Sequence, residues 1–183
     1  MADPLIPATV IGSWSFPGWY EKLIAEMQAH PDQFGPADRE EVLDDAVRLA
    51  IDDQARAGLG RVTDGEMNRV DFNLGFYDYL RGIEPVATLR RWGAPAHDQR
   101  SKYRCVAPLS APAGLGTIIE LRRLRAFTHR AIKMPVPGAF TLAGCIDGGD
   151  VYRDRAEVTE ALIPIVNAEL LALQRHGVDF LQI

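Results

Sequence analysis

The chain has 183 residues, of which 47% are hydrophobic and 25% are charged, which is ordinary for a globular protein with one core. Its net charge is −5 and it has no basic block, so we expect no nucleic-acid partner. No apolar run approaches the roughly 20 residues that a membrane span needs, and residues 1–4 lack the features of a signal peptide. We therefore expect one domain over residues 1–183 in a cytoplasmic protein that does not enter a membrane.

The first element in chain order is a β-prone run over residues 7–13 that ends in Ile11-Gly12-Ser13. We predict a buried strand here. A strand that ends in Gly and Ser leaves backbone N–H groups and a hydroxyl free at its carboxyl end, where α/β folds often anchor ligands. A plain strand-to-loop turn explains the same residues. A short helix is expected over residues 21–29.

The next helix is predicted to begin at Asp38 as its N-cap and to end at Gly58. A short apolar strand from residue 61 follows, and then four charged residues occur within eight positions: Asp64, Glu66, Arg69 and Asp71. Charges this dense after a buried strand are costly to desolvate unless they pair or bind something. They form either a solvated surface turn or a binding site.

The later elements alternate between helical and strand-like patterns. Arg104 stands between aromatic and apolar neighbours, so its guanidinium either pairs locally or faces a ligand. Pro164 predicts a kink in the longest helix. The expected elements are an aromatic-rich helix over 72–80, short paired strands over 102–106 and 115–119, a helix over 120–130, a strand from 132, a helix over 153–176 and a strand over 178–183.

This order gives four strand–helix passes, which build a parallel α/β sheet. Four passes suit a small open sheet or half of a (β/α)8 TIM barrel, whose usual length is about 250 residues. A last strand without a following helix has an exposed edge, which is an unusual end for a domain. We therefore expect an incomplete TIM barrel, made of about the first four β/α units plus a small β insertion and truncated at the fourth strand.

Five motifs in this order resemble the N-terminal half of the catalytic barrel of the cobalamin-independent methionine synthase family. The resemblance extends from Thr9 to Ile183. Its pieces are Thr9-Val10-Ile11-Gly12-Ser13, Asp64-Gly65-Glu66 followed by Arg69 and Asp71, Arg104-Cys105-Val106, Lys133 through Thr141, and Gly177-Val178-Asp179-Phe180-Leu181-Gln182-Ile183.

The resemblance implies a zinc-dependent transfer of a methyl group to a thiol, typically homocysteine. It implies that Ile11, Gly12, Ser13 and Glu66 hold the substrate amino acid, with Glu66 as the anchor of the ammonium group and with Arg69 and Asp71 supporting it. Arg104 matches a position near the acidic end of the methyl donor. The family's zinc ligands lie beyond the last strand present here, so no residue of this chain is assigned to the metal. The catalytic residues stay unassigned.

Several points depart from the family pattern. Where folate-using members carry a Trp that stacks on the pterin, this chain has Ala143-Gly144-Cys145-Ile146, so the donor is either a methyl-folate or a methyl-corrinoid, the latter carried by a corrinoid protein. A coenzyme M-type thiol transferase is an alternative function. Another is a non-catalytic half-barrel that needs a partner chain or self-association. The two cysteines, Cys105 and Cys145, lie in no metal-ligand spacing and are expected to be small buried side chains.

Overall fold

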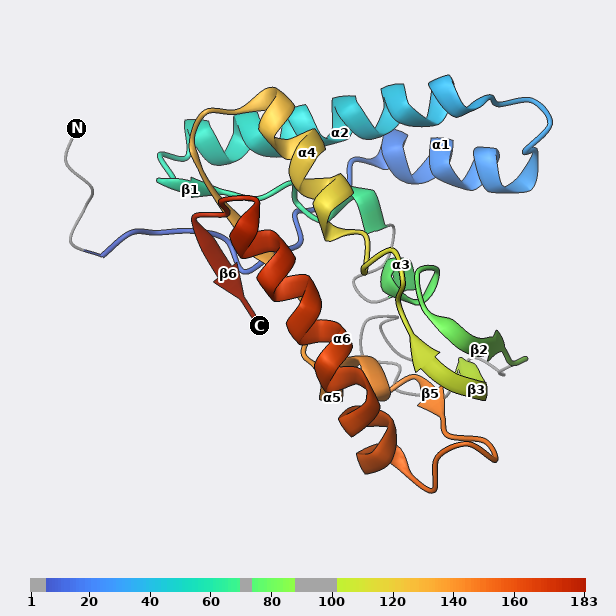
Figure 1. Cartoon of the computed structure of the whole chain (residues 1–183). Coiled ribbons are helices and arrows are strands. Elements are labelled where there is room, and N and C mark those ends of the chain that lie inside the picture. The colour runs from blue at the N-terminus through green and yellow to red at the C-terminus, as the bar shows by residue number, and fades with distance from the viewer. Residues whose placement is uncertain (1–5, 70–73, 88–101) are drawn as a thin grey trace.

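The computed structural model describes residues 6–69, 74–87 and 102–183, which form two small sheets covered by helices (Figure 1). The helices are α1 (Gly18–Ala29), α2 (Pro36–Arg56), α3 (Leu74–Tyr77), α4 (Thr117–Phe127), α5 (Ala139–Ala143) and α6 (Arg155–Arg175), with one 3-10 turn, η1 (Met67–Arg69). The strands are β1 (Arg61–Val62), β2 (Arg81–Pro85), β3 (Tyr103–Ser110), β4 (Ala131–Pro135), β5 (Ile146–Asp147) and β6 (Phe180–Gln182).

The first sheet is parallel, as predicted, with the strand order β1-β4-β6. Val62 pairs with Ile132, and Met134 pairs with Leu181. Each of its strands follows a helix in the chain, namely α2, α4 and α6. The carboxyl ends of the three strands therefore lie at one edge of the sheet, where loops from distant parts of the sequence meet. The sheet is open and does not close into a barrel.

The second sheet is the small β insertion, with the order β2-β3-β5. β2 and β3 form an antiparallel pair, and β3 continues in parallel with β5. The predicted strand over residues 115–119 is wrong, because α4 begins at Thr117 after Gly116, whose φ is 90°. β2, which the sequence pattern did not indicate, takes its place beside β3.

The predicted first strand over residues 7–13 is also wrong. Residues 6–13 form no strand in the structure, and Ile11 is 83% exposed. Carbonyl oxygens of this segment accept hydrogen bonds from side chains instead of a neighbouring backbone; for example, the Thr63 hydroxyl donates to the Gly12 carbonyl at 3.2 Å. The β-prone composition therefore produces an extended segment without a ladder.

The N-cap of helix α2 lies three residues before the predicted one. Gly35 is its N-cap, and Asp38 lies inside the first turn, where its carboxylate accepts a hydrogen bond from the Gly35 N–H at 2.6 Å. A carboxylate near a helix N-terminus is favourable in both positions. Of the aromatic-rich helix predicted over 72–80, only α3 is described as helix, and Asp71 and Phe72 lie outside the described residues.

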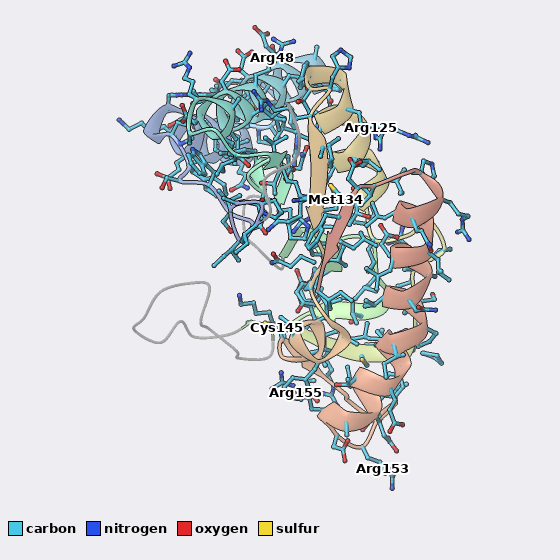
Figure 2. The ribbon with its side chains drawn as sticks, turned by 90° about the vertical axis from the view of Figure 1, so that its left-hand side faces the viewer. Arg48, Arg125, Met134, Cys145, Arg153 and Arg155 are labelled. Atoms are coloured by element: carbon cyan, nitrogen blue, oxygen red, sulfur yellow. The ribbon has the colours of Figure 1, made fainter. Side chains whose placement is uncertain are left out.

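The final helix and strand were predicted correctly. Asp154 caps α6 by accepting hydrogen bonds from the N–H groups of Ala156 and Glu157, and Pro164 lies inside the helix. Met134 of β4 is buried at the centre of the molecule, whereas Arg153 lies at its periphery (Figure 2). None of the helices in the described part of the chain is long and apolar enough to cross a membrane.

Candidate substrate site at the end of the first sheet

The turn that follows β1 is held in place by the buried side-chain amide of Gln54. Gln54 of α2 accepts a hydrogen bond from the Thr63 N–H at 3.0 Å and donates to the Thr63 carbonyl at 2.9 Å. Gly65 and Glu66 then both adopt the left-handed region, with φ of 70° and 60°. A side chain other than glycine pays about 1–3 kcal/mol for such a conformation, which is found most often at functional sites. The backbone therefore reverses as soon as the strand ends, and Glu66 stays in the interior.

Glu66 is a buried carboxylate with an incomplete set of partners. Its side chain is almost fully covered, and its Oε2 accepts a hydrogen bond from the Ser13 hydroxyl. Its Oε1 lies 3.5 Å from Nη1 of Arg69, yet neither of these two atoms has a hydrogen-bond partner among the described residues. Burial raises the pKa of the Glu66 carboxyl, and the Ser13 hydrogen bond and the Arg69 charge act against that rise. One oxygen of this carboxylate thus has the Arg69 charge beside it but accepts no hydrogen bond from the described residues.

Gly12 lies directly against Glu66. A Cβ added at position 12 would collide with Oε1 of Glu66 and lie 3.4 Å from the Pro135 ring. Only a glycine lets the segment over residues 11–13 approach the carboxylate this closely. The structure thus brings Gly12, Ser13 and Glu66 together, although residues 12 and 66 are far apart in the sequence.

The Ser13 hydroxyl is engaged within the candidate site, and a role of Ser13 in substrate binding stays a prediction. Its hydroxyl proton is committed to Glu66, so this hydroxyl orients the carboxylate and cannot donate to a ligand at the same time. Ile11 is exposed to solvent, and its carbonyl accepts a hydrogen bond from Lys133 at 2.8 Å. The backbone N–H groups of Ile11, Gly12 and Ser13 have no acceptor among the described residues.

Arg69 is a buried cation that lies beside Glu66. It forms a bidentate pair with Glu120 of α4 and also donates from Nη2 to the Pro135 carbonyl at 2.8 Å. Its guanidinium lies 4.6 Å from the centre of the Phe76 ring. Burial raises the pKa of the Glu120 carboxyl to about 7, although the Arg69 charge favours its ionised form. Arg69 therefore joins η1, α4 and the end of β4 under the candidate site.

Arg104 is not part of this cluster. It lies on β3, which belongs to the second sheet (Figure 1). Its side chain is half exposed, and its guanidinium pairs with Asp150 at 3.6 Å. The structure thus supports the local pairing of Arg104 that the sequence left open, and a role toward a methyl donor stays a prediction.

A zinc site is not formed by the described residues. In residues 6–69, 74–87 and 102–183, no three His, Cys, Asp or Glu side chains are placed to hold a metal ion. Both cysteines are buried, and burial raises the pKa of the Cys105 thiol, which opposes the thiolate form that zinc binds. The donor groups present here therefore do not fit a zinc ion.

Three buried polar residues of the site were not predicted as site residues: Gln54, Glu120 and Lys133. Gln54 follows Ala46 and Ala50 at helical spacing, so it is a polar residue on an apolar stripe, and this signal was available in the sequence. Lys133 likewise stands in a strand, β4, whose other four residues are all apolar. For Glu120 no comparable signal exists, because its partner Arg69 is far away in the sequence.

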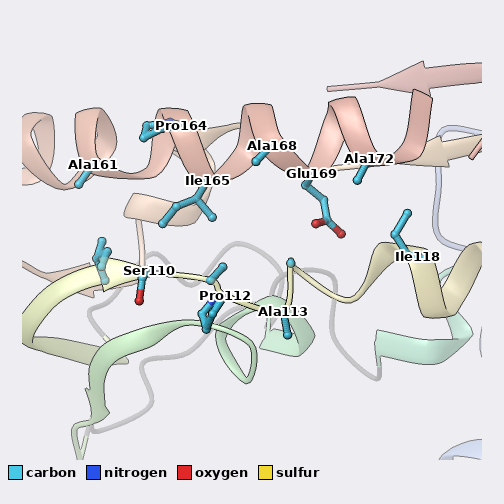
Figure 3. A pocket seen from close by; sticks show the side chains of 13 residues that line it. Ser110, Pro112, Ala113, Ile118, Ala161, Pro164, Ile165, Ala168, Glu169 and Ala172 are labelled. Atoms are coloured by element: carbon cyan, nitrogen blue, oxygen red, sulfur yellow. The ribbon is translucent and has the colours of Figure 1, made fainter. Parts of the chain in front are cut away.

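A separate cavity of about 570 Å³ lies between α6 and the connection from β3 to α4 (Figure 3). It is lined mainly by small apolar side chains such as Ala161, Pro164 and Ala168. Its buried carboxylate, Glu169, accepts hydrogen bonds from the N–H groups of Leu115 at 2.8 Å and Thr117 at 3.0 Å. Glu169 thus holds the start of α4 and is committed to the fold.

No family model matches the chain. It is 26% identical to methionine synthase of Pyrococcus furiosus over 185 residues, and 28% identical to methionine synthase of Thermococcus kodakarensis over 186 residues. Both alignments cover 100% of this chain, and they cover 52% and 53% of the relatives.

The chain is homologous to cobalamin-independent methionine synthase. It spans about half the length of the curated relatives it matches. The fold agrees with a B12-independent methionine synthase from a Shewanella species in complex with selenomethionine, with a TM-score of 0.70 at 24% identity over 97% of this chain and 51% of that chain. A Listeria monocytogenes protein described as a B12-independent methionine synthase gives a TM-score of 0.71 at 18% identity over 100% of this chain and 52% of that one.

Proposed function

We propose that this chain supplies the amino-acid-binding half of a methyltransferase that moves a methyl group to a thiol such as homocysteine. In this proposal it forms the first four β/α units of a TIM barrel of the methionine synthase family. The observation that carries the proposal is the buried Glu66 carboxylate, whose Oε1 has no hydrogen-bond partner among the described residues. An ammonium group from a bound amino acid would complete its contacts.

The backbone beside Glu66 fits the other end of an amino acid. The ammonium nitrogen and the carboxylate carbon of an α-amino acid are bonded to the same carbon, so their protein anchors must lie a few ångström apart. Gly12, which touches Glu66, belongs to the segment whose N–H groups have no acceptor among the described residues. We propose Ile11, Gly12, Ser13 and Glu66 as the binding residues, with Arg104 as a further candidate toward the methyl donor.

In this proposal no residue of this chain is a ligand of the zinc ion. Zinc lowers the pKa of a bound thiol, so that the nucleophilic thiolate exists at neutral pH. The family resemblance places the zinc ligands in later strands of the barrel. The donor is proposed to be a methyl-folate or a methyl-corrinoid.

The burial of Glu66 favours an amino-acid thiol over coenzyme M, which lacks an ammonium group. Leaving a buried carboxylate oxygen without a partner costs about 1–3 kcal/mol or more, so a site of this kind discriminates against a ligand that has no donor. The open sheet favours a second candidate, a half-barrel that acts only together with a partner chain or a second copy.

Calorimetry with L-methionine tests the proposed function. Glu66→Gln should weaken methionine binding by about 1.5–3 kcal/mol, the range of a hydrogen bond to a charged group. The same substitution should leave the binding of the desamino analogue of methionine unchanged, because that ligand makes no contact through an ammonium group. Glu26→Gln, at an exposed position of α1, is the control. An equal loss for both ligands would refute the assigned role of Glu66.

A further inference from the structure

Lys133 is a buried ammonium in the middle of the first sheet. It lies on the central strand β4, and only 1% of the residue's surface is exposed. An ammonium group costs a great deal to bury unless each of its three N–H groups finds an acceptor. Lys133 finds three: its Nζ donates to the carbonyls of Val10 and Ile11, the latter at 2.8 Å, and to Oε1 of Gln182 at 2.8 Å.

These hydrogen bonds hold a segment that has no strand neighbour. Residues 6–13 form no ladder with β1. The segment is attached by side chains: the Thr9 hydroxyl donates to the Arg61 carbonyl at 3.2 Å, the Thr63 hydroxyl donates to the Gly12 carbonyl at 3.2 Å, and Lys133 binds the two carbonyls between them. Lys133 is therefore the charged group that fixes the rotation of the peptide planes in this segment.

Because the peptide group is planar, the direction of these carbonyls also fixes the direction of the N–H groups that follow them. In a planar trans peptide, the C=O of one residue and the N–H of the next point in opposite directions. With the Val10 and Ile11 carbonyls turned toward Lys133, the N–H groups of Ile11 and Gly12 must point away from it. Neither N–H has an acceptor among the described residues, and Gly12 lies against the Glu66 carboxylate.

We propose that Lys133 is a positioning residue for substrate binding: by holding the Val10 and Ile11 carbonyls, it orients the N–H groups of Ile11 and Gly12 toward the carboxylate of the bound amino acid. This inference rests on the proposed function. It assigns to Lys133 an effect on one end of the substrate only, the end opposite to the one that Glu66 anchors. Gln182 of β6 supports the same arrangement by accepting the third hydrogen bond.

Calorimetry with two ligands tests the inference. L-methionine carries both an ammonium and a carboxylate, whereas methioninol keeps the ammonium and lacks the carboxylate. Lys133→Met should weaken methionine binding about tenfold to a hundredfold, the range expected when a hydrogen bond to a charged group is lost, and should change methioninol binding less than about twofold. Glu66→Gln should weaken both ligands. A similar loss of methionine and methioninol in Lys133→Met would overturn the inference, because general damage to the fold affects both ends of the site.

A second variant and a second measurement distinguish the proposed effect from misfolding of Lys133→Met. Gln182→Met keeps the ammonium and removes one of its three acceptors, so we expect a smaller loss of affinity that is again confined to methionine. Amide NMR of the ligand-free chain should show shifted signals for Ile11 and Gly12 in either variant, and unchanged signals there would overturn the inference. If the unsubstituted chain binds neither ligand, the proposed function fails, while the amide signals still decide whether Lys133 orients these two groups.

Discussion

Arg69 and Glu120 meet as two parallel hydrogen bonds beneath the candidate site, from Nε to Oε1 at 2.9 Å and from Nη2 to Oε2 at 2.7 Å. Both side chains are buried. The pair joins η1 to α4, and the third guanidinium nitrogen, Nη1, lies 3.5 Å from Glu66. A buried ion pair of this kind stabilises a fold little more than well-packed apolar side chains would. Removing only one partner is strongly destabilising, because the other charge then stays buried without its counter-ion.

Arg69→Met should therefore lower the free energy of unfolding by about 3–5 kcal/mol, because it leaves the Glu120 carboxylate buried without its cation. Urea unfolding measures the change. The double variant Arg69→Met/Glu120→Leu should be less destabilised than the single one. Arg153→Met, which removes an exposed pair with Glu157, is the control and should change the free energy of unfolding far less, because solvent screens that pair. A double variant as unstable as the single one would contradict the prediction.

The pH dependence of stability should report the buried Glu66. Burial raises its pKa above the ordinary value of 4.5, so the folded chain holds this proton more tightly than the unfolded chain. The stabilisation is complete below pH 4.5 and is lost as the pH rises through the raised pKa. The difference in unfolding free energy between the unsubstituted chain and Glu66→Gln should fall with rising pH in that window. Urea unfolding in a pH series measures it, and a difference that rises instead would contradict the burial argument.

Affinity for methionine should change in the opposite direction over the same pH window. An ammonium group binds the ionised carboxylate, so raising the pH through the Glu66 pKa should strengthen binding while it weakens the fold. Calorimetry at several pH values checks this. Methionine binding to Glu66→Gln should be flat over that range, and a parallel rise in the variant would assign the titration to another group.

Gly12→Ala should disrupt the site through the close approach to Glu66. The new methyl group would collide with Oε1 of Glu66, so either the segment or the carboxylate must move. We expect the loss of methionine affinity to reach at least about tenfold, as for a hydrogen bond to a charged group. Gly60→Ala is the control, because no atom lies within 4 Å of an added Cβ there. Equal affinities in the two variants would exclude a role for the approach of Gly12 to Glu66.

Glu169→Leu should destabilise the chain without acting on the Glu66 site. The substitution leaves the N–H groups of Leu115 and Thr117 and the Thr117 hydroxyl without their acceptor. Each buried unsatisfied donor costs about 1–3 kcal/mol, so we expect a loss of about 3 kcal/mol or more. Glu160→Leu, at an exposed position of the same helix, provides the comparison. Similar stabilities of the two variants in urea would show that Glu169 does not hold the start of α4.

Some of the fold could be predicted from local patterns. The apolar spacing of α2 and α6, the strands that begin near residues 61, 103 and 131, and the parallel sheet follow from periodicity and from the order of the elements. The predicted strands over 7–13 and 115–119 are wrong for one shared reason. In both places buried side chains of distant elements, such as Lys133 and Glu169, take the backbone groups that a strand would use. Local sequence does not contain that competition.

The sequence by itself determined that charged and small residues follow the strands, and that Glu66 stands in a tight turn after β1. Only the tertiary structure decided which of these charges are buried and which oxygen is left without a partner. In the folded chain Arg104 lies on a separate sheet and pairs with Asp150. The Ser13 hydroxyl donates a hydrogen bond to Glu66, and Lys133 donates one to the Ile11 carbonyl. The physical reason is that desolvation and hydrogen-bond completion depend on every group within a few ångström, and those groups come from elements that only the folded chain brings together.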